Sequence, residues 1–282
     1  MKKILVTGAN GQLGSELSEL SSDYSQYEWY FADRTQITLD NLDLLKTQLN
    51  KIQPDIILNC GAYTAVDKAE SEKDLAFTIN HLAVGLIAKH AKDNDVKLIH
   101  ISTDYVFDGT SSIALNEEAK TNPINIYGAS KLAGEVACLK ENPDSIIIRT
   151  SWVYSKFGNN FVKTMQRLMQ ERESINVVND QTGSPTYAAD LAQAMLCILE
   201  TSNWIPGIYN YSNEGEISWY EFALSIKELG GYSCNIEGIP SVSYPTPAKR
   251  PKFSLLDKKK IKTIYNLDVP DYKESLKKCL CK

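Results

Sequence analysis

The sequence predicts an α/β fold, in which a doubly wound parallel sheet is followed by a smaller α+β region. Two observations predict the sheet: short runs of continuous Ile, Leu and Val recur over the first 150 residues, and helical segments separate them. Strands buried on both faces of a parallel sheet carry such runs rather than an alternating pattern. The third observation is that Pro and Tyr become frequent after residue 205, as in 243–247, which indicates a less regular C-terminal region.

The order of the expected elements is that of a doubly wound domain. The predicted strands are residues 3–7, 29–32, 55–59, 97–102 and 145–150. The predicted helices are residues 12–20, 41–51, 72–93, 130–140, 160–172 and 188–200. Because the last of these helices is expected to return to the sheet, we predict a first domain of residues 1–150 plus a segment near 180–200. The remainder of 151–282 is predicted to form the second region.

Composition and charge argue against several classes of partner. The chain has a formal net charge of −5 over 282 residues, whereas nucleic-acid binders neutralise phosphates with an excess of Lys and Arg. It has no signal-peptide pattern and no apolar stretch of the roughly 20 residues that a membrane span requires. We therefore expect a cytoplasmic protein without nucleic-acid or membrane partners, whose six cysteines are reduced thiols.

A glycine-rich loop follows the first predicted strand. Residues 8–14 read GANGQLG, a G-x-x-G-x-x-G pattern that leads into the helix 12–20. Glycines at these positions permit a tight turn, a close approach to a pyrophosphate and close packing of helix on strand, while the helix N-terminus offers unpaired N–H groups. This spacing is typical of extended short-chain dehydrogenases and predicts an NAD(P)-binding Rossmann domain. The loop residues expected to contact the cofactor are Gly8, Asn10, Gly11, Gln12, Leu13 and Gly14.

Residues after the second and third predicted strands should complete the cofactor site. Asp33 ends the second strand about 20 residues after the loop, where an acid usually binds the adenosine ribose hydroxyls of NAD. Arg34 is adjacent and suits a 2′-phosphate, so NADH and NADPH both remain open. The other residues expected along the cofactor are Asp40, Asn41, Ala62, Tyr63 and Thr64.

Tyr127 and Lys131 are predicted to form the chemical core. They fit Y-x-x-x-K, and residues four apart lie on one face of a helix, so the phenol and the ammonium point the same way. A nearby ammonium, together with the nicotinamide charge, is expected to lower the tyrosine pKa from about 10. Lys131 is also expected to hold the nicotinamide ribose. Thr103, at the carboxyl end of the strand 97–102, adds a hydroxyl, and the three side chains are predicted to converge on one substrate oxygen.

Several longer segments resemble the dTDP-4-dehydrorhamnose reductase family of the extended short-chain dehydrogenase/reductase superfamily. They are NCGAYTAVDKAE at 59–70, HISTDYVF at 100–107, YGASKLAGE at 127–135, RTSWVY at 149–154 and YPTPA at 244–248. The resemblance implies NAD(P)H-dependent reduction of the C4 keto group of dTDP-6-deoxy-L-lyxo-4-hexulose to dTDP-L-rhamnose. The site roles that it implies are Tyr127 as proton donor, Lys131 as its partner, Thr103 and Asp104 as substrate contacts, and Trp152 against the sugar.

The diphosphate of such a substrate needs local positive charge in an acidic chain. Arg250 lies in the Pro-rich loop 247–251, and arginine binds phosphate through two parallel N–H bonds. We therefore predict that Arg250 contacts the substrate. The alternatives for this residue are a solvated basic turn and a structural salt bridge.

The metal site of some members of this family is expected to be missing. Those members form a dimer bridged by magnesium through three acids, of which Glu16 matches the first. Ala189 stands at the second place, beside Asp190, and the tail 277–282 carries no acid. Because Mg²⁺ requires several oxygen ligands in near-octahedral geometry, we expect no bridging magnesium, and a monomer or a homodimer.

Two other functions remain open at the level of sequence. One is another sugar-nucleotide reductase or epimerase on the same scaffold, and the other is a non-catalytic NAD(P)-binding regulatory subunit. The complete set of Thr103, Tyr127 and Lys131 favours an enzyme. No residue evidently selects dTDP over UDP.

Overall fold

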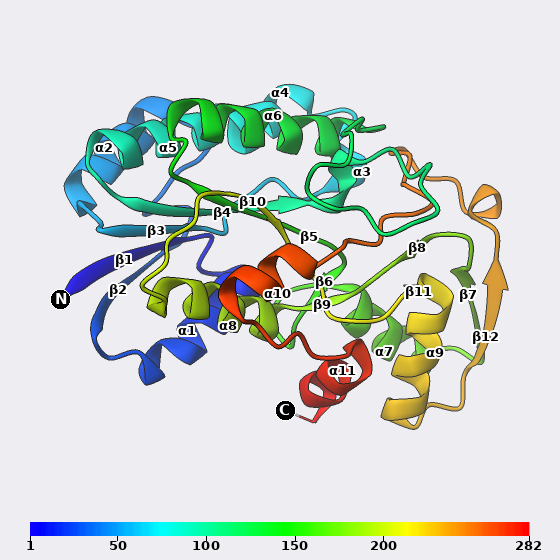
Figure 1. The fold of residues 1–282 in the computed structure, drawn as a ribbon. Coiled ribbons are helices and arrows are strands. Elements are labelled where there is room, and N and C mark those ends of the chain that lie inside the picture. Colours follow the sequence, from blue (N-terminus) through cyan, green and yellow to red (C-terminus); the bar gives the residue numbers. More distant parts are fainter. Residues whose placement is uncertain (282) are drawn as a thin grey trace.

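A six-stranded parallel sheet is the centre of the computed structural model, which describes residues 1–281 (Figure 1). Its strand order is β10-β5-β4-β3-β1-β2, and every neighbouring pair is parallel. The strand order reverses between β1 and β3, and ligands of such sheets bind at the carboxyl ends of the strands at this point. The strands are β1 (Lys2–Thr7), β2 (Tyr27–Ala32), β3 (Ile56–Asn59), β4 (Lys97–Thr103), β5 (Ile146–Thr150) and β10 (Gly207–Asn210).

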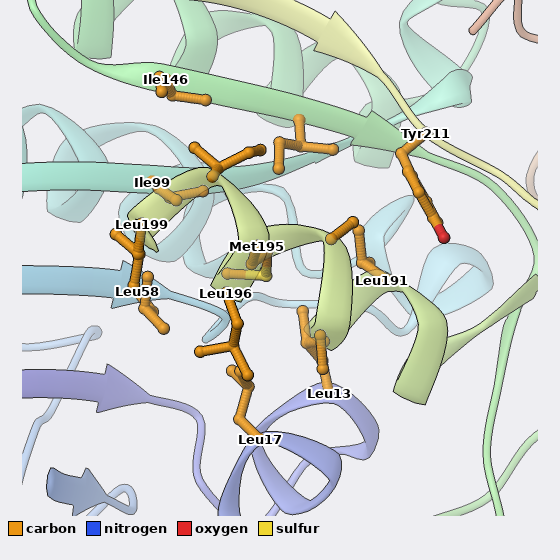
Figure 2. Packing of buried hydrophobic residues seen from close by; sticks show 14 of the residues in the cluster. Leu13, Leu17, Leu58, Ile99, Ile146, Leu191, Met195, Leu196, Leu199 and Tyr211 are labelled. Carbon is orange, nitrogen blue, oxygen red and sulfur yellow. The ribbon is translucent and has the colours of Figure 1, made fainter. Parts of the chain in front are cut away.

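Helices cover both faces of the sheet, which explains the continuous apolar runs. In β1, Ile4 and Val6 enter one hydrophobic core and Leu5 enters the other. The first core packs against α1 (Gln12–Leu20), α8 (Ala188–Glu200) and α10 (Lys259–Tyr265). Figure 2 shows the leucines of α1 and α8 meeting the strand side chains there. The second core packs against α2 (Leu42–Ile52), α5 (Ala83–Asp93) and α6 (Ile126–Glu141).

A smaller α+β region lies beside the carboxyl ends of the strands (Figure 1). This region has an apolar core of its own. The core is enclosed by the helices α7 (Phe161–Glu171), α9 (Trp219–Gly230) and α11 (Tyr272–Leu280) and by the parallel pair of β7 (Ser174–Val178) and β12 (Asn235–Ile239). A capping box between Ser218 and Glu221 starts α9. This region also contains two short strand pairs. One is β6 (Val153–Tyr154) with β9 (Thr186–Tyr187), and the other is β8 (Thr182–Gly183) with β11 (Ile217–Ser218).

The predicted fold class is confirmed, and one strand of the sheet was missed. All five predicted strands are present, although β2 begins at Tyr27 rather than at residue 29. Strand β10 was not predicted because it is four residues long, lies at an edge and begins with Gly207 at φ +133°. After the smaller region begins, the chain returns to the sheet twice, first through α8 and β10 and later through α10, whereas the sequence predicted one returning segment near 180–200.

The helix predicted over residues 72–93 is interrupted, which corrects the sequence prediction. It consists of α4 (Lys73–Phe77), a π-helical turn (Thr78–Leu82) and α5, preceded by the short α3 (Val66–Ala69). Such π turns frequently occur at functional sites. Here the turn contains the fully buried Asn80, whose contacts are described below. Among residues 1–281, no helix has the length and hydropathy needed to cross a bilayer.

The helix predicted over residues 130–140 begins earlier, at Ile126. The Asn125 side chain accepts a hydrogen bond from the Gly128 N–H at 2.7 Å and so caps the new N-terminus. Tyr127 and Lys131 therefore both lie in the first part of α6, one turn apart, as the Y-x-x-x-K spacing requires.

The packing of α8 on the sheet leads to a stability prediction. Leu196 is fully buried there, so Leu196→Ala should lower the free energy of unfolding by about 2–5 kcal/mol through a cavity. The matched control is Leu44 on α2, which is 42% exposed, and Leu44→Ala should change the same quantity by less than about 0.5 kcal/mol. Urea denaturation measures both, and equally small losses would contradict the packing of α8.

Candidate active site

The carboxyl ends of β1, β3 and β4 are joined by buried polar contacts. The Thr7 hydroxyl donates to Asn59 Oδ1 at 2.7 Å and accepts from the Gly61 N–H at 3.0 Å. Asn59 Nδ2 lies 2.9 Å from His100 Nδ1. Burial holds the pKa of His100 well below its usual range, so the imidazole is neutral. These contacts hold three strand ends in register, next to the glycine loop.

The glycine loop has the geometry of a phosphate cradle. Gly8 adopts a left-handed φ of +67°, and a Cβ on Gly14 would lie 2.4 Å from the Gly8 carbonyl oxygen. Gly11 precedes α1, and no side chain caps this helix. The first N–H groups of α1 are thus available to a pyrophosphate, which fits the predicted dinucleotide.

Two of the loop residues predicted to contact the cofactor, Leu13 and Gln12, have side chains that take part in other contacts. Leu13 belongs to the core between α1 and α8 (Figure 2). Gln12 donates to the Val153 carbonyl at 3.2 Å and accepts from Asn160 Nδ2 at 2.9 Å, which ties α1 to the smaller region. Only the backbone of these two residues fits a role toward the cofactor. Asn10 is exposed at the loop.

Asp33 lies at the end of β2, as predicted, and also organises its own turn. Its Oδ1 accepts from the Thr35 N–H at 2.8 Å, from the Thr35 hydroxyl at 2.7 Å and from the Gln36 N–H at 3.3 Å. The hydrogen bonds from Thr35 hold the pKa of Asp33 below its usual range. Within residues 1–281, Oδ2 accepts no hydrogen bond and Arg34 is exposed, so both groups are accessible to a ribose or a 2′-phosphate.

The other residues predicted to lie along the cofactor, 40–41 and 62–64, differ in exposure and in hydrogen bonding. Asn41 accepts from the Leu44 N–H at 3.0 Å and caps α2, whereas Asp40 is exposed. Ala62, Tyr63 and Thr64 follow β3, and Tyr63 is nearly buried.

Asn80 is a buried polar residue beside the candidate site that sequence reasoning missed. Its side chain accepts from the Tyr63 N–H at 2.8 Å and donates to the Tyr63 carbonyl at 3.0 Å. It also donates to the Ser130 hydroxyl at 3.0 Å. One buried amide thus fixes the loop 62–64 to the helix that contains Tyr127. No sequence pattern indicates it, because its orientation depends on the π turn.

Thr103, Tyr127 and Lys131 come together at the carboxyl end of β4. Burial raises the pKa of Tyr127 to about 12, while a hydrogen bond with Thr103 acts in the opposite direction. Lys131 Nζ donates to the Ile101 carbonyl at 2.7 Å, and burial lowers the pKa of this ammonium to about 8. The sequence predicts that Lys131 and the nicotinamide charge lower the pKa of Tyr127; in the protein alone burial is the largest effect, and Thr103 rather than Lys131 acts against it. The phenol is therefore neutral and can donate a proton.

Asp104 and Ser254 extend this group toward the smaller region. Asp104 is buried, and the burial raises its pKa to about 6, against hydrogen bonding to Ser254 and Thr103. Asp104 Oδ1 accepts from the Thr103 hydroxyl at 3.1 Å. Ser254 comes from the C-terminal part of the chain and was not predicted. The site therefore includes carboxyl and hydroxyl groups suited to a hydroxylated ligand.

Trp152 has a strained backbone and a stacked ring. Its φ is +48°, a conformation that costs a non-glycine residue about 1–3 kcal/mol and is found at functional sites. Its ring stacks on Trp219, the first residue of α9, with centroids 3.7 Å apart and an interplanar angle of 15°. Trp219, also missed from the sequence, holds the indole in place.

Arg250 takes part in a salt bridge, which is one of its predicted alternatives. Its Nη1 and Nη2 donate to the Asp67 carboxylate at 3.1 and 2.8 Å. Nη1 also contacts the Thr246 hydroxyl and the Ala248 carbonyl. Within residues 1–281 the Nε group has no hydrogen-bond partner. Contact with a diphosphate stays a prediction for this residue.

The acids considered for a metal have protein partners. Glu16 accepts from the Ser155 hydroxyl at 2.6 Å. Asp190 accepts from Asn213 Nδ2 at 2.7 Å and from the Ser275 hydroxyl at 2.5 Å. Among the described residues, no group of three or more His, Cys, Asp or Glu side chains could hold a metal ion.

Comparison with known proteins decides the family. A family model described as the RmlD substrate binding domain matches residues 1–282. The dTDP-4-dehydrorhamnose reductase of Aggregatibacter actinomycetemcomitans is 39% identical, over 98% of each chain. That of Escherichia coli K12 is 38% identical, over 98% of this chain and 96% of its own. The chain belongs to the dTDP-4-dehydrorhamnose reductase family.

Solved structures of dTDP-4-dehydrorhamnose reductases agree with this assignment. The reductase of Bacillus anthracis, in complex with NADP, is 40% identical, with a TM-score of 0.94 over 99% of both chains. That of Clostridium acetobutylicum is 37% identical with a TM-score of 0.94, over 99% of this chain and 98% of its own. The UDP-glucose 4-epimerase of Thermus thermophilus, 17% identical with a TM-score of 0.84 over 99% and 98%, shares the fold.

The close approach at Gly14 generates a binding prediction. Gly14→Ala places a methyl group against backbone atoms at 2.4–2.8 Å, so α1 must move and the phosphate cradle opens. The dissociation constant for NADPH should rise at least about tenfold, equivalent to 1.4 kcal/mol. Gly85→Ala is the matched helical control, because its methyl meets only the Ala137 side chain at 3.3 Å. Cofactor fluorescence titration measures both, and equal affinities would exclude the cradle.

Proposed function

We propose that this chain is an NAD(P)H-dependent reductase that converts dTDP-6-deoxy-L-lyxo-4-hexulose to dTDP-L-rhamnose in dTDP-rhamnose biosynthesis. The observation that carries the proposal is the convergence of Thr103, Tyr127 and Lys131 at the carboxyl end of β4. Family membership supports the substrate, and the glycine loop supports the cofactor.

The protein groups have distinct roles in the proposed reaction. NAD(P)H, when bound, supplies the hydride that reduces the C4 carbonyl. Tyr127 is neutral in its buried position and donates its proton to the C4 oxygen. The Thr103 hydroxyl, which donates to Asp104 Oδ1 in the protein alone, would turn to donate a hydrogen bond to the same oxygen as negative charge develops there. Lys131 binds the nicotinamide ribose and stabilises the phenolate that remains after proton transfer.

The substrate is proposed to bind between the two regions of the chain. Trp152, fixed by Trp219, presents an aromatic face that suits the C–H face of a pyranose. Asp104 accepts a hydrogen bond from a sugar hydroxyl. Arg250 contributes positive charge near the diphosphate, through the N–H groups that Asp67 does not use.

Cofactor choice and assembly are further parts of the proposal. Asp33 and Arg34 allow both NADH and NADPH, since one residue suits ribose hydroxyls and the other a 2′-phosphate. The protein acts in the cytoplasm, without a bridging magnesium, as a monomer or a homodimer.

Replacing Tyr127 by Phe tests the proton donor. Turnover should fall about 10²–10⁴-fold because general acid catalysis is lost, while affinity for NADPH stays nearly unchanged. The assay follows NADPH oxidation with and without the dTDP-4-keto sugar. Tyr232→Phe, which removes a hydroxyl that bonds Gln166 far from β4, is the matched control. Retention of more than half of the activity in Tyr127→Phe would rule out this role.

A further inference from the structure

Strand β4 and helix α6 are joined by three polar contacts from consecutive strand residues. The Ile101 carbonyl accepts from Lys131 Nζ, and the Ser102 hydroxyl donates to Glu135. Thr103 lies near enough to the Tyr127 phenol to lower its pKa, against the larger effect of burial. The three α6 side chains are spaced four residues apart and so lie on one face of the helix. Two of them belong to the proposed chemistry, whereas Glu135 has no role in it so far.

Glu135 forms a completely buried ion pair with Arg149 of β5. Arg149 Nε donates to Oε1 at 2.9 Å and Nη2 donates to Oε2 at 2.6 Å. The two side chains are only 2% and 3% exposed. This two-pronged geometry is typical of an ionised carboxylate. A negative charge is thus held in the protein interior, one helical turn from Lys131.

Few other charges lie near Lys131. The titratable groups that face it are Glu135 and Cys138 on α6, Cys60 after β3, and His100 on β4. Burial raises the pKa of the Cys60 thiol to about 12 and that of Cys138 to about 11. Burial also holds the pKa of His100 well below its usual range. At neutral pH three of these four groups are uncharged. Glu135, which is itself paired with Arg149, is the group among them that places a negative charge one turn from the buried ammonium.

We propose that Glu135, fixed by Arg149 and Ser102, is a positioning residue that keeps Lys131 charged and directed toward the cofactor ribose. This inference rests on the proposed reductase function. A contribution to folding stability does not by itself explain why the Glu135–Arg149 pair is present. Apolar side chains of similar volume can often replace a buried ion pair without lowering the stability of the fold. Its position one turn from Lys131 fits an electrostatic role.

The pH dependence of kcat separates this role from a structural one. Removal of the carboxylate disfavours the Lys131 ammonium, so its pKa falls. As the pH rises, the ammonium is then deprotonated earlier, so the activity that depends on it is lost at a lower pH than in the unmodified enzyme. We expect Glu135→Gln to move the alkaline limb of kcat toward acid by about one pH unit. Glu135→Gln combined with Arg149→Met removes both charges and leaves no unpaired arginine. It should shift the alkaline limb in the same direction but by less, because the repulsion between Lys131 and an unpaired Arg149 is absent.

Two further variants complete the experiment. Glu135→Asp retains the charge and should keep the alkaline limb of the unmodified enzyme even if its melting temperature falls. Glu214→Gln makes the same chemical change in an ion pair far from α6, where Glu214 lies 3.2 Å from Lys258, and should leave the pH profile unchanged.

An unshifted alkaline limb in the double variant, with turnover present, would overturn the role of Glu135. A shift of equal size in Glu214→Gln would do the same. Absence of sugar-dependent NADPH oxidation in the unmodified protein would instead overturn the proposed function, so the two failures are distinguishable.

Discussion

The contact between β4 and α6 is the constraint on which the rest of the site depends. A Cβ on Gly128 would lie 2.1 Å from the Tyr105 carbonyl oxygen, so the helix approaches the end of the strand as closely as glycine permits. This approach brings Tyr127 to Thr103 and Lys131 to the Ile101 carbonyl. A small displacement of α6 would separate Tyr127, the proposed proton donor, from Thr103, even though both residues would still be present.

The smaller region is attached to this rigid centre through side-chain contacts close to the candidate site. Gln12 joins the start of α1 to β6, and Ser254 lies near enough to Asp104 to lower its pKa, against the larger effect of burial. The Asp67–Arg250 ion pair links the segment after β3 to the Pro-rich loop. Each contact connects a cofactor-side element to a substrate-side element. For the proposed reaction, the arrangement would couple the position of the sugar to that of the dinucleotide, as hydride transfer between them requires.

The sequence predicted those features that depend on local patterns. Continuous apolar runs predicted the parallel strands, and the spacings of GANGQLG and of Tyr127 with Lys131 predicted the loop and the dyad. Features that depend on long-range packing were missed. Strand β10 forms only because the chain returns to β5, and Asn80 reaches Tyr63 only because a π turn rotates it inward. The lowered pKa expected for Tyr127 beside Lys131 and the nicotinamide stays a prediction, and the opposing effect of burial was missed because burial is a property of the whole fold.

Hydride transfer to C4 of the sugar is tested most directly with NADPH doubly deuterated at C4 of the nicotinamide. The unmodified protein would be incubated with the dTDP-4-keto sugar, and the product examined by NMR and mass spectrometry. Reduction as proposed gives dTDP-L-rhamnose with one deuterium at C4 of the sugar. A product with only protium at C4, or release of NADP without a reduced sugar, would contradict the proposed reaction.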